Sequence, residues 1–341
     1  MAPPRGGTPP ARAPVRGSTS SVALPARRRH RSTRRSSGDR SRRRAGWPRT
    51  YHTLVSYVRY PRAGSPAPAA TGWDAWAEDY AALGASNPTY ALGKELLHEI
   101  VDEVSAPPRS REAWVLDFHC GAGDDLARFL ARGWHAVGCD GSLGMLAAAA
   151  ARCESDATSG RLELWHGRAE ELELSSFEAR RFDLVFSTTG GFAYLDDELF
   201  VRVHRLLASM LVPGGVMVVA HLTRFCAAEG LFHLLHLRPR RAVERWRGRV
   251  PVTVRGERML MRLRSPRHIR QLLAGVLHVW RLTPLLWCTP PFQSGFVPGP
   301  RTLTALRAIE RQTAHIDALA VLADQVVCVA RPLDTSSNNA R

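Results

Sequence analysis

The stretch that decides the fold is VLDFHCGAGDD, which occupies residues 115–125. An apolar run leads into a turn that contains Gly121 and Gly123, and a helix is predicted to follow at residues 125–132. Glycines lack the Cβ atoms that would keep a ligand from the backbone, and the N–H groups at the start of a helix face that ligand. Asp124 is expected to cap the helix. Alone, such a turn is a weak indication, because many strand-to-helix turns carry glycine for packing reasons.

Strand-like and helix-like segments alternate on both sides of this turn. Buried strands are predicted at residues 113–118, 135–139, 162–165, 182–186, 215–220 and 325–330. Helices are predicted at residues 73–80, 90–104, 142–153, 196–210, 267–273 and 302–322. The alternation is typical of an α/β fold with three layers, in which helices cover both faces of a doubly wound, mostly parallel sheet.

An acidic residue at the end of the second predicted strand supports a ligand site. Asp140 follows Asp117 by 23 residues. A carboxylate at this place can accept hydrogen bonds from both hydroxyls of a ribose. The alternative, in which Asp140 is a surface residue that caps the helix beginning at Ser142, stays open.

The basic character of the chain lies in its first residues. The net charge is +16, but residues 1–50 hold 14 Arg and one acidic residue, a local charge of +13, so the rest carries only +3. Residues 1–65 are rich in Pro, Arg and Ser and are predicted to be disordered, as are residues 334–341. The tail resembles an organellar transit peptide, and it could also contact phosphates nonspecifically. A tail without a function is the third alternative.

The composition of the body excludes several classes. The six cysteines are scattered without a C-x-x-C pair, which indicates free thiols in a reducing compartment and predicts a cytoplasmic protein. No apolar run reaches the roughly 18–20 residues of a membrane span. No metal site is predicted. Lys94 is the only lysine, so the excess of Arg indicates a coding bias and not a choice of bidentate contacts.

Five segments together resemble the class I S-adenosylmethionine (SAM) dependent methyltransferases, in the order and spacing of that family. They are VLDFHCGAG (115–123), GCDGSLGML (138–146), WHGRAEEL (165–172), FDLVFSTTGGFAY (182–194) and LVPGGVMVV (211–219). The resemblance covers about residues 70–222. It implies a seven-stranded sheet completed by residues 324–331, a methyltransferase domain over residues 66–333, and an acceptor-binding lid inserted at about residues 222–300, before the last strands.

The resemblance also implies a division of labour at a SAM site. Asp117 would support the loop and the methionine amino group, and Asp140 would hold the ribose. His119 replaces the usual first glycine, and its side chain either points away or reaches the acceptor. Arg168 stands where an Asp is frequent, so adenine recognition would rest on backbone amides near Ala169. The predicted cofactor-binding residues are Asp117, His119, Gly121, Gly123, Asp140, Gly167, Ala169 and Ser187.

The acceptor is expected at the carboxyl ends of the fourth and fifth strands. The predicted acceptor region comprises Thr188, Thr189, Tyr194 and Phe292. If the acceptor is a hydroxyl, a general base helps, and His221 is the candidate at the end of the fifth strand. A polar strand terminus bonded to backbone is the alternative for His221, and Tyr194 and His119 are weaker candidates. His204, His233 and His236 fall on predicted helices and are expected to be structural.

These observations predict a methyltransferase for a small-molecule acceptor whose methylated atom stays open. A SAM-binding regulatory protein without catalysis and an RNA or DNA methyltransferase guided by the tail are the alternatives. The Ser-Thr-Thr-Gly sequence after the fourth strand disfavours methylation of exocyclic base amines, and no specific nucleic-acid partner is expected.

Residues 231–247 (LFHLLHLRPRRAVERWR) are expected to form a cap helix with a solvated basic end; an acceptor lid and contact with an anionic membrane surface are the alternatives. The oligomeric state is left open.

Overall fold

A computed structural model of the chain describes residues 58–59, 71–107, 110–177, 180–188 and 190–333. The disorder predicted for residues 1–65 and 334–341 lies outside these ranges, except at residues 58–59, which form a short strand.

The centre of the fold is a sheet with the strand order β1-β4-β3-β2-β5-β6-β10-β9. In that order the strands are β1 (Val58–Arg59), β4 (Leu162–His166), β3 (His135–Asp140), β2 (Trp114–Phe118), β5 (Phe182–Ser187), β6 (Leu211–Leu222), β10 (Gln325–Pro332) and β9 (Leu277–Leu285). Strands β1 to β6 pair in parallel, whereas β10 is antiparallel to both β6 and β9. Without the two-residue β1, this is the seven-stranded, mostly parallel sheet that the sequence predicts.

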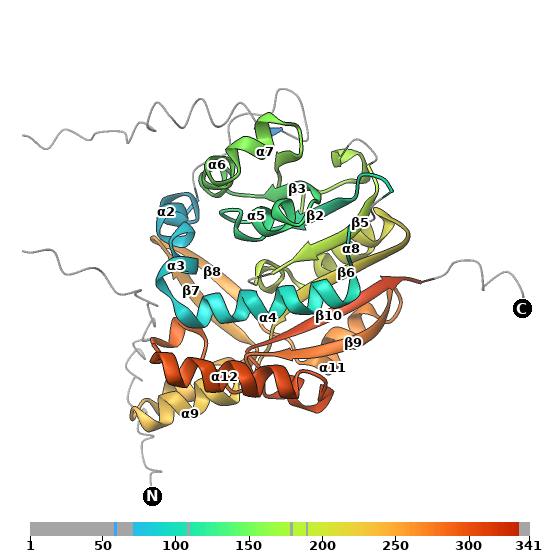
Figure 1. The fold of residues 1–341 in the computed structure, drawn as a ribbon. Coiled ribbons are helices and arrows are strands. Elements are labelled where there is room, and N and C mark those ends of the chain that lie inside the picture. Colours follow the sequence, from blue (N-terminus) through green and yellow to red (C-terminus); the bar gives the residue numbers. More distant parts are fainter. Residues whose placement is uncertain (1–57, 60–70, 108–109, 178–179, 189, 334–341) are drawn as a thin grey trace, which may run out of the picture.

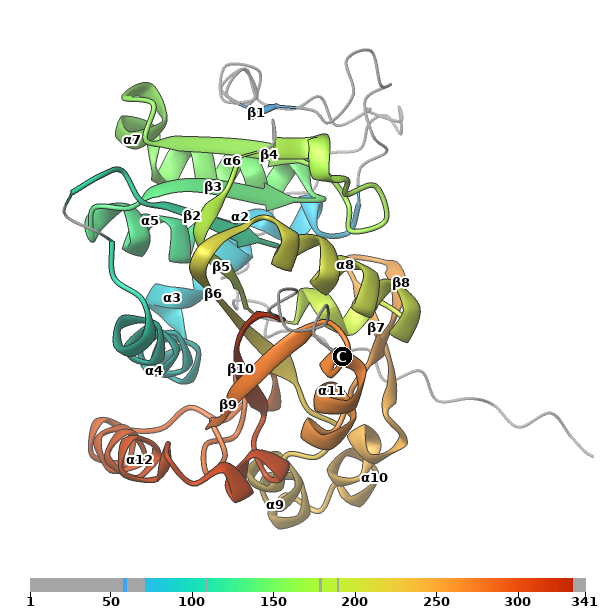
Figure 2. The ribbon, with the colours of Figure 1, turned by 90° about the vertical axis from the view of Figure 1, so that its right-hand side faces the viewer.

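Helices cover both faces of the sheet, as predicted (Figure 1, Figure 2). One face carries α4 (Pro88–Val104), α5 (Asp124–Ala131) and α6 (Leu143–Arg152), with α12 (Pro300–Thr313) packed against α4. The other face carries α8 (Asp197–Ser209), α11 (Pro266–Leu273) and the 3₁₀ turn η7 (Asp317–Val321). Alternate residues of β2 divide between the two cores: Val115 belongs to the first, and Leu116 and Phe118 to the second.

The remaining elements are short and lie at the edges of these layers. They are η2 (Asp74–Trp76), α2 (Ala77–Ala81), α3 (Leu83–Ser86), α7 (Glu154–Thr158), η3 (Leu174–Phe177), η4 (Gly191–Tyr194), α9 (Ala227–Leu235), α10 (Pro239–Ala242), η5 (Glu244–Arg247), β7 (Arg249–Val254), β8 (Glu257–Arg262) and η6 (Phe292–Ser294). None of the helices in the described part of the chain has the length and apolar character that crossing a bilayer requires.

Two parts of the sequence prediction need correction. Residues 277–285, assigned to the lid, form the edge strand β9 of the main sheet. Pro284 lies within this strand, and a proline argues against a strand unless the strand is at an edge, which sequence alone does not reveal. The helix predicted at 302–322 ends at Thr313, and η7 follows it.

The hairpin β7–β8 reaches across to the segment before α4. The Gly72 N–H donates to the Glu257 carboxylate at 2.5 Å, and Arg255 forms an ion pair with Asp79. A Cβ on Gly72 would lie 2.2 Å from the carbonyl oxygen of Val254, so only glycine fits there. The inserted hairpin and residues 71–81 therefore meet over the carboxyl edge of the sheet.

A buried charged group joins α4 to α5. The ammonium of Lys94 pairs with one carboxylate oxygen of Asp125, and Nε2 of His98 lies 2.9 Å from the other. All three side chains are buried. Burial raises the pKa of Asp125, but Lys94 and His98 outweigh it and hold that pKa below its ordinary value. The only lysine of the chain thus neutralises a carboxylate inside the core.

Lys94→Met should lower the free energy of unfolding by about 3–5 kcal/mol, because it leaves the Asp125 carboxylate buried without its counter-ion. Arg132→Met is the matched control. It removes an exposed ion pair with Asp102 (2.8 Å), and the expected loss is below about 1 kcal/mol. Denaturant titrations followed by circular dichroism measure both variants. If both variants lost the same free energy of unfolding, the buried ion pair would contribute no more to stability than the exposed one, and the prediction would be wrong.

Candidate functional site: the loop after β2 and the carboxyl edge of the sheet

The loop after β2 places three alternate residues in the left-handed region of backbone space. The φ angles are +63° at His119, +54° at Gly121 and +78° at Gly123. Glycine adopts this region freely, but a residue with a Cβ pays roughly 1–2 kcal/mol. The Cys120 N–H donates to the carbonyl of Cys139 at 3.0 Å and ties the loop to β3. His119 therefore occupies a position whose backbone suits glycine, and its side chain must be held by packing.

The two glycines serve different neighbours. A Cβ on Gly121 would lie 3.2 Å from the ring of Tyr80, so the loop is in close contact with α2. A Cβ on Gly123 would lie 2.9 Å from the Cβ of Ala149, so Gly123 lets α6 pack against the loop. Gly123 is also the N-cap residue of α5, and the cap predicted for Asp124 is absent.

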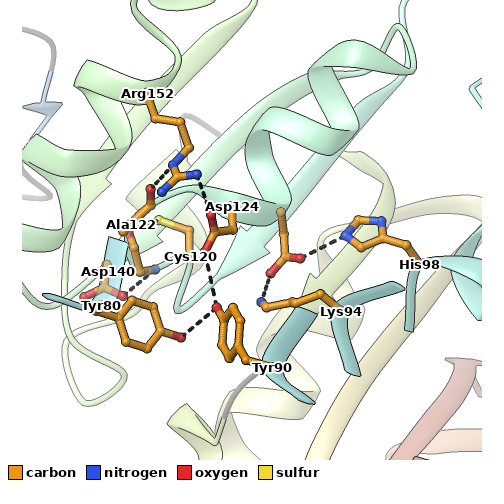
Figure 3. A network of polar contacts seen from close by, with 11 residues as sticks. Tyr80, Tyr90, Lys94, His98, Cys120, Ala122, Asp124, Asp140 and Arg152 are labelled. Carbon is orange, nitrogen blue, oxygen red and sulfur yellow. Dashed lines mark hydrogen bonds and ion pairs between the residues drawn. The ribbon is translucent and has the colours of Figure 1, made fainter. Parts of the chain in front are cut away.

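Asp124 instead fastens the loop to two helices (Figure 3). Its carboxylate accepts a hydrogen bond from the Tyr90 hydroxyl of α4 at 3.2 Å and pairs with Arg152 of α6 at 2.5 Å. Arg152 also donates to the carbonyl of Ala122 at 3.0 Å. These contacts hold the loop from both sides.

Asp140 lies at the carboxyl end of β3 and binds the loop directly. Its carboxylate accepts hydrogen bonds from the N–H groups of Gly121 (3.0 Å) and Ser142 (2.9 Å). The N-cap of α6 is Ser142 and not Asp140, since the Ser142 hydroxyl accepts from Met145 N–H at 3.1 Å. Burial raises the pKa of Asp140 to about 6, although the backbone hydrogen bonds favour the charged form. The position and the remaining lone pairs fit a ribose.

Asp117 is the least satisfied group of the site. Its side chain is 0% exposed, and neither carboxylate oxygen has a hydrogen-bond partner among the described residues. Burial and the nearby Asp125 carboxylate raise the pKa of Asp117 well above its ordinary value. A buried carboxyl without partners is costly unless a ligand supplies a donor or a positive charge. The ammonium of the methionine part of SAM supplies both, so the residues present fit this cofactor.

The other predicted cofactor residues lie at the ends of β4 and β5. The Gly167 N–H donates to the carbonyl of Asp140 at 3.1 Å, so this amide links the strands. Ala169 is buried, and its carbonyl accepts from Arg202 at 3.2 Å. Ser187 is buried at the end of β5, and its hydroxyl has no partner among the described residues. Their contacts with a cofactor stay predictions.

The side chain of His119 turns toward η4. A Cβ on Gly191 would lie 2.4 Å from the imidazole, so the ring lies directly against the start of η4. It also packs against Phe118 (ring centroids 4.0 Å apart) and edge-on against Phe192 (5.3 Å). Burial lowers the pKa of His119 to about 3, and Nδ1 has no hydrogen-bond partner in the described part of the protein. A neutral imidazole thus lies beside the predicted acceptor segment.

His221 is placed deeper than the sequence prediction assumed. It is buried among the rings of Phe192, Phe200 and His204, whose centroids lie 5.2 to 5.5 Å from its own. Burial lowers the pKa of His221 well below its ordinary value. His204 bonds through Nδ1 to the carbonyl of Phe200 at 2.7 Å, which agrees with the structural role expected for it. The role of His221 as a base stays a prediction.

A row of aromatic rings frames the site. Each ring lies 5.1 to 6.1 Å from the next, in the order Tyr194, Trp73, Trp76, Tyr80, Tyr90 and Phe292. All except Tyr90 are half-buried, so their surfaces are partly open. The two ends, Tyr194 and Phe292, were predicted for the acceptor; the four rings between them were not. The helical spacing of residues 73, 76 and 80 predicts that their side chains share one face of a helix. It does not show which residues that face contacts.

The other two residues predicted for the acceptor region are Thr188 and Thr189. Thr188 is buried after β5, and Thr189 lies outside the described residues. No group of three or more His, Cys, Asp or Glu side chains suited to a metal ion occurs among the residues that the structure describes.

The sheet order, the loop after β2 and the two carboxylates at its edge define a SAM-dependent methyltransferase of class I. Residues 115–215 match the family described as a methyltransferase domain. The chain thus contains a methyltransferase domain, as the sequence motifs predicted. No curated protein matches the sequence.

Several solved structures are similar to the chain. A SAM-dependent methyltransferase from Clostridium acetobutylicum ATCC 824 has 13% identity and a TM-score of 0.47, over 76% of this chain and 99% of that one. A Haloferax volcanii putative methyltransferase, solved in complex with the Trm112 activator, has 17% identity and a TM-score of 0.48, over 77% and 99%. The glycopeptide N-methyltransferase MtfA, complexed with SAM, has 15% identity and a TM-score of 0.43, over 70% and 93%. Similarity at this level carries no inference about the substrate.

The affinity for the cofactor should fall as the pH drops through about 6. The charged carboxylate of Asp140 is the better acceptor for the ribose hydroxyls, and its pKa in the free protein is about 6. Calorimetric titration with S-adenosylhomocysteine at pH 8 and at pH 5 measures the change. Asp140→Asn should bind more weakly at pH 8 and lose the part of the pH dependence that is centred near pH 6. If the variant keeps the wild-type pH profile, another group is responsible.

Proposed function

We propose that this methyltransferase acts on a small-molecule acceptor that carries an apolar or aromatic part. The observation that supports this proposal is the row of aromatic rings from Tyr194 to Phe292, which runs past the loop after β2 and is half-buried at every ring except Tyr90. Aromatic faces bind planar and apolar groups through dispersion and offset stacking. Binding sites for small molecules are mostly apolar with a few placed polar groups, and this edge of the sheet has that composition.

The arrangement suits methyl transfer because it aligns the acceptor and excludes water. SAM supplies a methyl group already activated on a sulfonium, so the protein needs mainly to orient the acceptor's lone pair in line with it. The β7–β8 hairpin and residues 71–81 meet over the carboxyl edge, and their contacts at Glu257 and Asp79 close that side. The aromatic row and this cover would keep water from the reacting atoms.

His119 is the polar group that we assign to the acceptor. Its imidazole lies against Gly191, at the start of the segment after β5, and it is neutral because burial lowers its pKa to about 3. With that pKa the ring is a weak base, so its expected work is to hold the acceptor's O–H or N–H by a hydrogen bond and so orient the lone pair. His221 lies behind Phe192 and would act only through the packing of that ring.

Transfer of a labelled methyl group tests the class of acceptor. The full-length protein is incubated with methyl-labelled SAM and a cell extract that has been separated into small molecules, RNA, DNA and protein. Label is expected in the small-molecule fraction, and a boiled enzyme is the control. Label in nucleic acid or protein would overturn the proposal. Binding of SAM without transfer to any fraction would favour a regulatory SAM-binding protein instead.

His119→Gly separates the two histidines in this role. The backbone there already suits glycine, so the variant should fold and bind SAM with nearly unchanged affinity. Turnover of the acceptor should fall by at least about tenfold, because the oriented hydrogen bond is lost. His221→Leu fills the same apolar shell and should keep turnover within a few-fold of wild type. The opposite pattern, with loss only in His221→Leu, would return the role of base to His221.

A further inference from the structure

Helix α9 presents leucines to solvent instead of to the core. Leu231, Leu234 and Leu235 follow helical spacing on one face and are 59%, 53% and 73% exposed. Leu237, in the turn after the helix, is 89% exposed and adopts a φ of +56°. The left-handed region is unfavourable for leucine, and the exposed side chain of Leu237 gains no packing in the core that would offset this cost. The opposite side of α9 is the packed one, since Phe232 contacts Phe296 and His233 is buried.

The apolar surface continues beyond the helix. Val243 and Trp246 are exposed in the segment that follows α9, and Val297 is exposed in the loop after η6, which contacts α9. Trp246 also lines a cleft of about 400 Å³, together with Phe225, Pro266 and Val321. Large apolar side chains exposed together on neighbouring elements mark a binding surface.

Arginines interleave with these apolar residues. Arg238, Arg240, Arg241 and Arg247 are exposed, and none of them has an ion-pair partner among the residues that the structure describes. Arg245 is different, because it pairs inside the protein with Glu229 at 2.6 Å and Asp324 at 2.7 Å. The Leu/Arg face is defined as Leu231, Leu234, Leu235, Leu237, Val243 and Trp246 with Arg238, Arg240, Arg241 and Arg247.

The charge of the Leu/Arg face decides among its occupants. A second copy of the same face would bring arginines against arginines, and like charges at a contact are unfavourable. The first 50 residues of this chain carry +13 and would be repelled in the same way. The occupant must therefore be anionic and also accept leucine side chains. An anionic lipid bilayer has both properties at its interface, with phosphates above an apolar interior.

We propose that the Leu/Arg face binds the surface of anionic membranes peripherally. The leucines and Trp246 enter the boundary between headgroups and acyl chains, and the four arginines contact lipid phosphates. In Figure 1, α9 lies at the lower left, on the side that also carries α2, α3 and the β7–β8 hairpin. The sequence favours a cap helix with a solvated basic end and leaves contact with an anionic membrane surface as an alternative; the exposure of the four leucines favours that alternative.

Vesicle sedimentation with the full-length protein tests the proposal. Wild type should sediment with phosphatidylcholine–phosphatidylglycerol vesicles and stay in solution with phosphatidylcholine alone. Leu234→Ser/Leu235→Ser should reduce the partition coefficient by at least about tenfold, since two buried leucines are lost from the interface. Ile309→Ser, at an exposed apolar position of α12, is the matched control and should bind as wild type does. Both variants change exposed positions, and unchanged thermal unfolding would show that they fold.

The leucine variant also separates the face from the basic tail, because it keeps every arginine of the chain. Equal sedimentation of the leucine variant and wild type would mean that the tail alone binds the vesicles, and the proposal would be wrong. No sedimentation of wild type would also overturn it. Light scattering after size-exclusion chromatography measures the oligomeric state as a last test. If wild type is a dimer that does not bind vesicles, and the leucine variant is a monomer, the face is an interface between two copies and the proposal is wrong. None of these outcomes depends on the acceptor or on turnover.

Discussion

The site depends on a backbone constraint in the loop after β2. Residues 119, 121 and 123 all lie in the left-handed region, and this conformation brings the Gly121 N–H onto the Asp140 carboxylate. Just before this turn, Asp117 is buried, and its carboxylate has no hydrogen-bond partner among the described residues. We therefore propose that Asp140 accepts hydrogen bonds from the ribose and that Asp117 binds the ammonium of the cofactor. The cost of these groups is recovered when a ligand with complementary donors binds.

The surrounding structure holds this loop rigidly. Arg152 and Tyr90 bind Asp124 from two helices, and α6 packs so closely that residue 123 must be glycine. Beneath them, Lys94 neutralises Asp125 and joins α4 to α5. A preorganised loop suits a methyltransferase, because the cofactor brings the reactive group and the protein contributes alignment. The inserted hairpin and the aromatic row lie over the edge at which we propose that the loop binds the cofactor.

The sequence predicted most of the fold because alternation of apolar strands and amphipathic helices is a local property. It missed β9, whose proline suggests a loop, and β1, which has only two residues and lies in a segment of disordered composition. The cofactor residues at 117, 121 and 140 could be proposed because their motif is contiguous and their spacing is fixed by strand and helix lengths. The aromatic row could not, since its rings come from η2, α2, α4, η4 and η6, which are distant in sequence.

The sequence by itself determined the class of protein, because the glycines, the carboxylates and the alternation of strands and helices occur in a fixed order along the chain. The tertiary structure decided where the two candidate histidines lie. His119 and His221 looked alike as candidates, but packing turned one toward η4 and enclosed the other among aromatic rings. The tertiary structure also decided which face of α9 remains in solvent. The sequence pattern shows that the helix has two different faces, but only the neighbouring elements determine which of them is buried.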